Sequence, residues 1–139
     1  GGVSGNAGLF GNAADVAAVY QMLLQGGQWQ GKQYLKEETV KFFLSSKSPS
    51  CRRALGFDKP DKKNPRLSPC CTDAPASVVG HTGFTGTCVW ADPANELVYV
   101  FLSNRTYPRP FDHKKLQQMD IRSRIQHILY GALKKKPQK

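Results

Sequence analysis

The stretch that decides the fold lies at residues 78–104 and has the sequence VVGHTGFTGTCVWADPANELVYVFLSN. Its first part, Val78–Trp90, predicts a β-strand with a glycine-rich start, where the absence of side chains lets another molecule approach the backbone. Residues 91–95 predict a turn because they combine Asp, Pro and Asn. Residues 96–104 carry an apolar run that predicts a buried strand. The two strands should therefore pair in antiparallel fashion.

Helices are predicted on both sides of these strands in the chain. Asn12 is a favourable N-cap for an amphipathic helix over 13–25, and the apolar spacing predicts a second helix over 36–45. A last helix is expected over about 113–133, capped by Asp112. The order of helix, helix, strands and helix predicts an α+β fold, with a small antiparallel sheet flanked by helices.

The other segments are expected to be short or irregular. Residues 29–35 predict a turn or short strand, and residues 46–76 predict a long loop with a short strand at 54–58. Residues 1–133 are expected to form the structured segment and residues 134–139 a solvated basic tail. Because about three strands make a small sheet, further strands are expected from outside the chain.

Charge is distributed unevenly along these 139 residues, whose formal net charge is +10. Residues 47–66 hold seven basic and two acidic groups, and residues 105–139 hold ten basic and two acidic groups. These groups fall in a loop, a helix face and a tail without any nucleic-acid motif, so nucleic-acid binding is not expected. No apolar run reaches the length of a membrane span.

The chain has four cysteines, Cys51, Cys70, Cys71 and Cys88. Their spacing lacks two C-x-x-C pairs, so no metal site is expected, and no cofactor motif is present. Cys51 and the Cys70-Cys71 pair bracket the long loop. A disulfide across this loop in an oxidising compartment and free thiols are both compatible with the sequence.

The residues best suited to chemistry lie at the start of the first predicted strand. His81 is a candidate proton donor or substrate-orienting group, because histidine is the residue type most often used for proton transfer, although a structural histidine is the simpler interpretation. The hydroxyls of Thr82 and Thr85 are further donors, and a backbone N–H just after Gly83 suits an oxyanion hole.

Asn104 and Arg105 follow the second predicted strand, and arginine pairs well with carboxylates. In an antiparallel pair of the strands 81–90 and 96–104, the start of one strand lies beside the end of the other. His81 and Asn104 are therefore expected to be neighbours.

The motifs that would supply a nucleophile are absent from these residues. The chain contains no S-x-x-K, no Y-x-N and no G-x-S-x-G sequence. Ser4-Gly5-Asn6 matches S-x-N but lies in a glycine-rich loop. His113 and His127 fall on the last predicted helix and are expected to be surface groups.

Three segments resemble, in order and spacing, the C-terminal part of a serine β-lactamase-like hydrolase of the class C and penicillin-binding-protein-like group. Residues 80–87 (GHTGFTGT) are similar to the family's K-T-G or H-T-G motif, residues 1–10 (GGVSGNAGLF) to its glycine segment, and residues 102–108 (LSNRTYP) to the strand end after the motif. The resemblance implies a partial β-lactamase/transpeptidase-like fold, which in the family has a five-stranded antiparallel sheet.

The resemblance also implies roles for individual residues. His81, Thr82 and Gly83 would occupy the motif, and the Phe84 backbone N–H would be an oxyanion donor. Asn104, with Arg105 and Thr85 (the three residues expected to contact substrate), would help recognise a substrate carboxylate. The serine and lysine of S-x-x-K would come from an upstream part of the domain, so the chain alone is expected to be inactive.

Residues 120–130 (DIRSRIQHILY) are more weakly similar to bacterial proteins that fuse a family 3 glycoside hydrolase to such a module. The longer protein to which the chain would belong, called the parent below, would then be a periplasmic or extracellular enzyme. The alternative is a non-catalytic binding or scaffold module of such a protein. The expected partners are the upstream remainder of the domain and, through an exposed sheet edge, a second copy of the chain.

Overall fold

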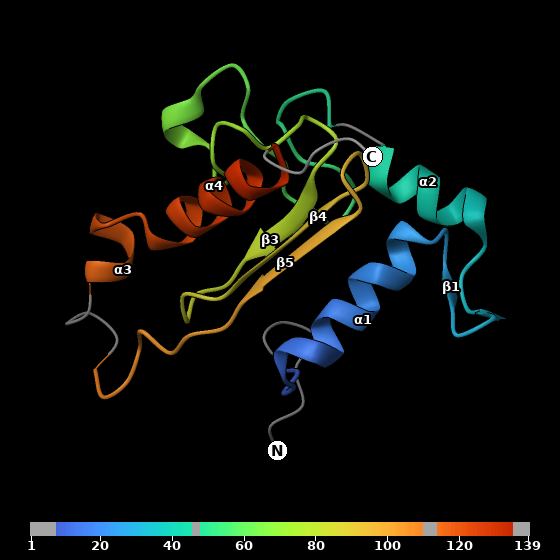
Figure 1. The fold of residues 1–139 in the computed structure, drawn as a ribbon, viewed down its shortest axis with the longest axis horizontal. Helices are drawn as coiled ribbons and strands as arrows, with labels where there is room; N and C mark the ends of the chain where they lie inside the picture. The colour runs from blue at the N-terminus through green and yellow to red at the C-terminus, as the bar shows by residue number, and fades with distance from the viewer. Residues whose placement is uncertain (1–7, 46–47, 110–113, 135–139) are drawn as a thin grey trace.

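The computed structural model describes residues 8–45, 48–109 and 114–134. In this part of the chain a three-stranded antiparallel sheet lies between helix α1 on one face and helix α4 on the other (Figure 1). The α+β class with a small sheet flanked by helices is therefore confirmed.

The two N-terminal helices form close to the predicted positions. α1 spans Ala13–Leu24, and the Asn12 side chain caps it by accepting a hydrogen bond from the Asp15 backbone N–H at 3.0 Å. α2 spans Glu37–Ser45. Between them the two-residue strands β1 (Gln28–Trp29) and β2 (Lys32–Gln33) form a small hairpin, as the expected turn or strand at 29–35 implied.

The single strand predicted over Val78–Trp90 was wrong, because that stretch forms two strands. β3 spans Val79–Thr82 and β4 spans Cys88–Asp92. The turn between them is closed by the Gly83 N–H, which donates to the Thr87 carbonyl at 2.8 Å. The turn needs glycine at Gly86, whose φ is 95°. β5 (Leu97–Phe101) then pairs with β4, in the order β3-β4-β5.

The loop over 48–78 crosses the outer edge of β3. The expected strand at 54–58 is reduced to one bridge, in which Asp58 and Gly80 exchange two backbone hydrogen bonds of 2.7 and 3.1 Å. The Asp58 carboxylate is almost fully buried, and Arg52 binds both of its oxygens at 2.8 Å. This ion pair fastens the loop to the sheet.

The last predicted helix is interrupted. α3 spans Lys115–Gln118 and α4 spans Ile121–Lys134, separated at Asp120, which has a φ of 47°. This left-handed conformation cannot continue an α-helix, so the single helix expected over 113–133 was wrong. The predicted cap Asp112 and the S-x-N segment lie outside the described residues, as does nearly all of the predicted tail.

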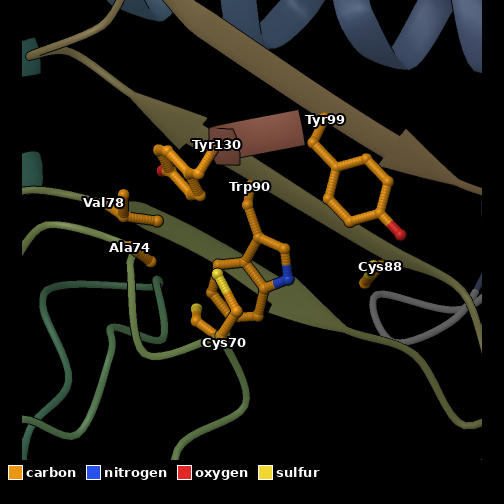
Figure 2. Close-up of a cluster of buried hydrophobic side chains, with 8 residues drawn as sticks. Cys70, Ala74, Val78, Cys88, Trp90, Tyr99 and Tyr130 are labelled. Carbon is orange, nitrogen blue, oxygen red and sulfur yellow. The ribbon is translucent and has the colours of Figure 1, made fainter. Parts of the chain in front are cut away.

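The hydrophobic core lies between the sheet and α4. Trp90 and Tyr99 are cross-strand partners on this face, and Tyr130 of α4 packs against them (Figure 2). The Tyr130 hydroxyl donates to the buried Asp92 carboxylate at 2.8 Å, so the buried charge has a partner.

Cysteines form part of the same core. Cys70, Cys71 and Cys88 are buried, Cys51 is exposed, and all four are free thiols. Burial raises the pKa of the Cys88 thiol to about 11, so the thiol stays neutral. No helix in the described part of the chain is both long and apolar enough to traverse a bilayer.

Candidate functional site

His81 lies on the exposed part of β3, opposite Val89. Its Nδ1 atom is 2.7 Å from the Thr82 carbonyl oxygen. Because a carbonyl only accepts, Nδ1 must carry the hydrogen. In the neutral ring Nε2 is then left with a free lone pair, which suits a group that takes up and returns a proton.

Among the described residues, no strand or bridge pairs with the outer edge of β3 beyond Gly80. Backbone groups in an antiparallel strand alternate in direction, and Gly80 points outward to Asp58. Thr82, two residues on, therefore also points outward. The Phe84 backbone N–H, in the turn after β3, donates no hydrogen bond to any residue that the structure describes, and Phe84 is 66% exposed. This amide is therefore a candidate donor to a substrate carbonyl.

Close packing explains the glycines of this segment. A Cβ at Gly83 would collide with the Thr87 hydroxyl, and one at Gly80 would collide with the Val89 carbonyl and come within 2.7 Å of Trp90. The backbone path through His81 therefore depends on side chains being absent on both sides of it.

Contacts from distant residues hold the β3–β4 turn. The Thr85 carbonyl accepts hydrogen bonds from the Arg105 backbone N–H at 2.9 Å and from the Ser103 hydroxyl at 3.2 Å. The guanidinium of Arg122, from α4, donates to the Thr87 carbonyl at 3.3 Å. Sequence reasoning missed Ser103 and Arg122, because no local pattern links them to this turn.

The strand pairing from which His81 and Asn104 were expected to be neighbours differs in the structure. β4 lies between β3 and β5, and the residue that pairs with Phe101 is Cys88 of β4. The Asn104 side chain is exposed and accepts two hydrogen bonds from Thr106.

Arg105 does reach the turn, by a different route from the predicted one. Its guanidinium lies over the Phe84 ring, 4.9 Å from the ring centroid. A positive charge is therefore held over the Phe84 side chain in this turn.

The described part of the site contains no activated nucleophile. Burial raises the pKa of Tyr20 to about 12, and the Cys88 thiol is neutral and covered. Within the same residues no three His, Cys, Asp or Glu side chains gather as metal ligands would. The site thus offers a proton carrier, a free amide and a cation, which can orient and polarise an acyl group.

Comparison with known proteins identifies the family. The family model described as Beta-lactamase matches residues 1–122, so the chain belongs to this family. A putative D-alanyl-D-alanine carboxypeptidase of Escherichia coli (strain K12) is 36% identical over 132 residues, which cover 94% of this chain and 30% of that protein. A putative D-alanyl-D-alanine carboxypeptidase of Salmonella agona (strain SL483) is 34% identical over 108 residues, covering 77% of this chain and 24% of the relative.

The resemblance found in the sequence is thereby confirmed at the level of the family. The chain spans about 30% of the length of the Escherichia coli relatives that it matches. The roles of His81, Thr82, Gly83, Phe84, Thr85, Asn104 and Arg105 stay predictions.

Proposed function

We propose that this chain is the C-terminal part of a β-lactamase-like serine hydrolase and supplies one wall of its acyl-transfer site. The observation that carries this proposal is the end of β3, where His81 with a free Nε2 precedes the unbonded Phe84 amide by three residues. The reaction would be attack by a serine on an amide, β-lactam or ester, followed by release of the acyl group to water.

Each group on this wall has a role in that reaction. The Phe84 N–H donates to the oxygen of the tetrahedral intermediate, and His81 carries a proton or orients the substrate. Thr82 and Thr85 add donors at the edge, and Gly83 keeps the turn narrow. Arg105 and Asn104 attract a substrate carboxylate.

In this proposal, the nucleophile lies on the upstream remainder of the domain, across the acyl-transfer site from this chain. Because these 139 residues contain neither S-x-x-K nor Y-x-N, we propose that the chain is inactive until it joins the remainder of the domain. The measurement is hydrolysis of nitrocefin and of a p-nitrophenyl ester by the purified chain. We expect no turnover above the buffer rate, and steady turnover by the chain would contradict the proposal.

The role of His81 is tested in the full-length parent. His81→Ala should lower kcat by about 100-fold, as expected for loss of a proton-transfer group. Lys115→Ala, which changes an exposed residue of α3, is the matched control and should leave kcat unchanged. Equal activity of the His81→Ala variant and the parent would remove His81 from the mechanism. A parent with no hydrolase activity would favour the non-catalytic scaffold alternative.

We also propose that the parent is an exported bacterial protein, located in the periplasm or outside the cell, with a family 3 glycoside hydrolase domain. The resemblance of residues 120–130 to such fusions supports this. Cell fractionation with antibodies against the chain tests the location, and cytoplasmic recovery would contradict it. The mass of the detected parent tests the fusion, since a protein too small to hold a second domain would exclude it.

A further inference from the structure

A second concave site lies on the α4 side of the molecule. The loop around the short 3-10 turn Pro65–Leu67 stands over α4 and, together with α3, encloses a groove of about 630 Å³. In Figure 1 this loop is the green segment beside α4, on the opposite side of the sheet from α1. Among the polar residues that line the groove are Arg66, Ser68, Thr72, Ser123, Arg124 and His127.

This groove is separate from the candidate hydrolase site. None of the residues that line it belongs to β3 or to the β3–β4 turn. His81 pairs with Val89, which lies on the α1 face of the sheet, whereas α4 covers the opposite face. The function proposed for the β3 edge therefore does not account for the groove.

The groove contains more hydrogen-bond donors than acceptors. The guanidinium groups of Arg66 and Arg124 have no hydrogen bond or ion pair with any described residue, although each carries several donors in a planar fork. The Ser68 oxygen accepts from the backbone N–H groups of Asp61 and Cys70, which leaves its own hydroxyl hydrogen free to donate.

His127 is held in a defined orientation at the edge of the groove. Its Nδ1 atom is 2.5 Å from the Asp73 carboxylate, which also binds the Lys134 ammonium at 2.8 Å. This pairing occupies Nδ1 and leaves Nε2 as the open ring nitrogen. The loop before β3 and helix α4 thus position the imidazole together.

Acidic groups do not balance this lining. Among the described residues, the one carboxylate that lines the groove is that of Asp120, which already accepts a hydrogen bond from the Ser123 hydroxyl at 2.8 Å. Two free guanidinium groups and free hydroxyl donors then line an open, partly apolar groove. An occupant that supplies several acceptor oxygens and negative charge would satisfy them.

We propose that this groove binds an oxyanion-bearing ligand, phosphate or carboxylate, through Arg66 and Arg124, with Ser68 and His127 as further contacts. The planar fork of arginine matches both kinds of anion, so the two share one recognition chemistry. The site is a second function of the chain, independent of acyl transfer.

The test is calorimetric titration of the 139-residue chain with inorganic pyrophosphate and, separately, with citrate, at constant ionic strength. We expect saturable binding of at least one probe. The double variant Arg66→Gln, Arg124→Gln should weaken the binding at least about tenfold, because two charge-assisted contacts are lost. A preference for pyrophosphate assigns a phosphate ligand, and a preference for citrate assigns a carboxylate ligand.

The control removes the same charge elsewhere. Lys36→Gln with Arg109→Gln lowers the net charge equally at exposed positions outside the groove. It should bind as the unchanged chain does. Absence of saturable binding by either probe would overturn the proposal, as would equal weakening by both double variants, since that would indicate only general attraction to a basic protein. Circular dichroism of each variant verifies the fold.

Discussion

At the residue scale, the candidate site depends on where side chains are missing. Gly80 lies where a Cβ would strike the neighbouring strand, whereas Gly131 of α4 has no atom within 4 Å of such a Cβ. The same residue type therefore has opposite structural consequences at the two positions. Packing at Gly80 keeps β3 close to β4 and so sets the path of the backbone through His81.

This contrast predicts the outcome of two matched substitutions. Gly80→Ala should lower the free energy of unfolding by about 1–3 kcal/mol, because the added methyl overpacks against Val89 and Trp90. Gly131→Ala should raise it by about 0.5–1 kcal/mol, because alanine is the better helix former and the space is open. Urea unfolding followed by tryptophan fluorescence measures both. Equal effects of the two changes would contradict the expected collision of a Cβ at Gly80 with β4.

At the scale of elements, α4 is tied to both ends of the site region. Arg122 binds the carbonyls of Gly86 and Thr87 in the β3–β4 turn. Near the other end of the helix, His127 and Lys134 bind Asp73 in the loop that precedes β3. α4 therefore packs on the core and also braces the two segments that flank β3.

Removing the contact between Arg122 and the β3–β4 turn should make this turn open faster. Arg122→Met keeps the apolar stem but removes the donors, so the turn loses its contact with α4. We expect the amide hydrogens of residues 83–87 to exchange faster with deuterium, as observed by mass spectrometry. Arg124→Met on the same helix is the control. Unchanged hydrogen exchange in the Arg122 variant would show that the β3–β4 turn is stable without its contact with α4.

The contacts of Asp73 with His127 and Lys134 predict that the free energy of unfolding depends on pH. Lys134, and after it His127, lower the pKa of the Asp73 carboxyl. A lowered folded-state pKa stabilises the fold above the unfolded pKa of about 3.9, and this stabilisation is lost as the pH falls through the folded value. Asp73→Asn should therefore destabilise the chain at pH 7 by at most about 1 kcal/mol, since both partners are largely exposed.

Urea unfolding at a series of pH values measures this difference. It should shrink toward zero as the pH falls below about 4, where the carboxyl becomes protonated. Glu96→Gln is the control, because Glu96 forms no ion pair with a described residue. A difference between the Asp73→Asn variant and the unchanged chain that stayed constant down to strongly acidic pH would exclude the ion pairs as its source.

At the scale of the whole molecule, the sheet has an uncovered edge. β5 is an edge strand within the described residues. Exposed large apolar side chains occur at Leu9, Phe10, Val19 and Phe42. Such surfaces in a chain that spans about 30% of its relatives' length suit contact with the remainder of a domain.

The open edge predicts self-association of the isolated chain. Alternation along β4 and β5 directs the backbone N–H of Val100 away from β4, so this group is available to a second copy. We expect dimers by light scattering at high concentration. Val100→Pro removes the N–H and should lower the dimer fraction. Lys36→Gln, at an exposed polar position before α2, is the control, and a clean monomer of the unchanged chain would contradict the prediction.

Sequence reasoning was most successful where the determinants are local. The helix capped by Asn12 formed within one residue of its predicted end, and the apolar run in residues 96–104 predicted the strand that the structure places at Leu97–Phe101. It failed at Val78–Trp90, because β-branched and aromatic residues on both sides concealed a turn at Gly83–Gly86. It also failed at Asp120, which adopts a left-handed conformation that most residues avoid and that local hydrogen bonds with Gln117, Ser123 and Arg124 accompany.

The sequence by itself determined the α+β class, the family motif at residues 80–87 and the lack of an S-x-x-K nucleophile, because these depend on residue type and short-range spacing. Only the tertiary structure decided which ring nitrogen of His81 is free, that Arg122 braces the turn, and that Arg66 and Arg124 share a groove. The physical reason is that these contacts join residues 35 or more positions apart, or depend on the direction of one hydrogen bond, and no local pattern encodes either.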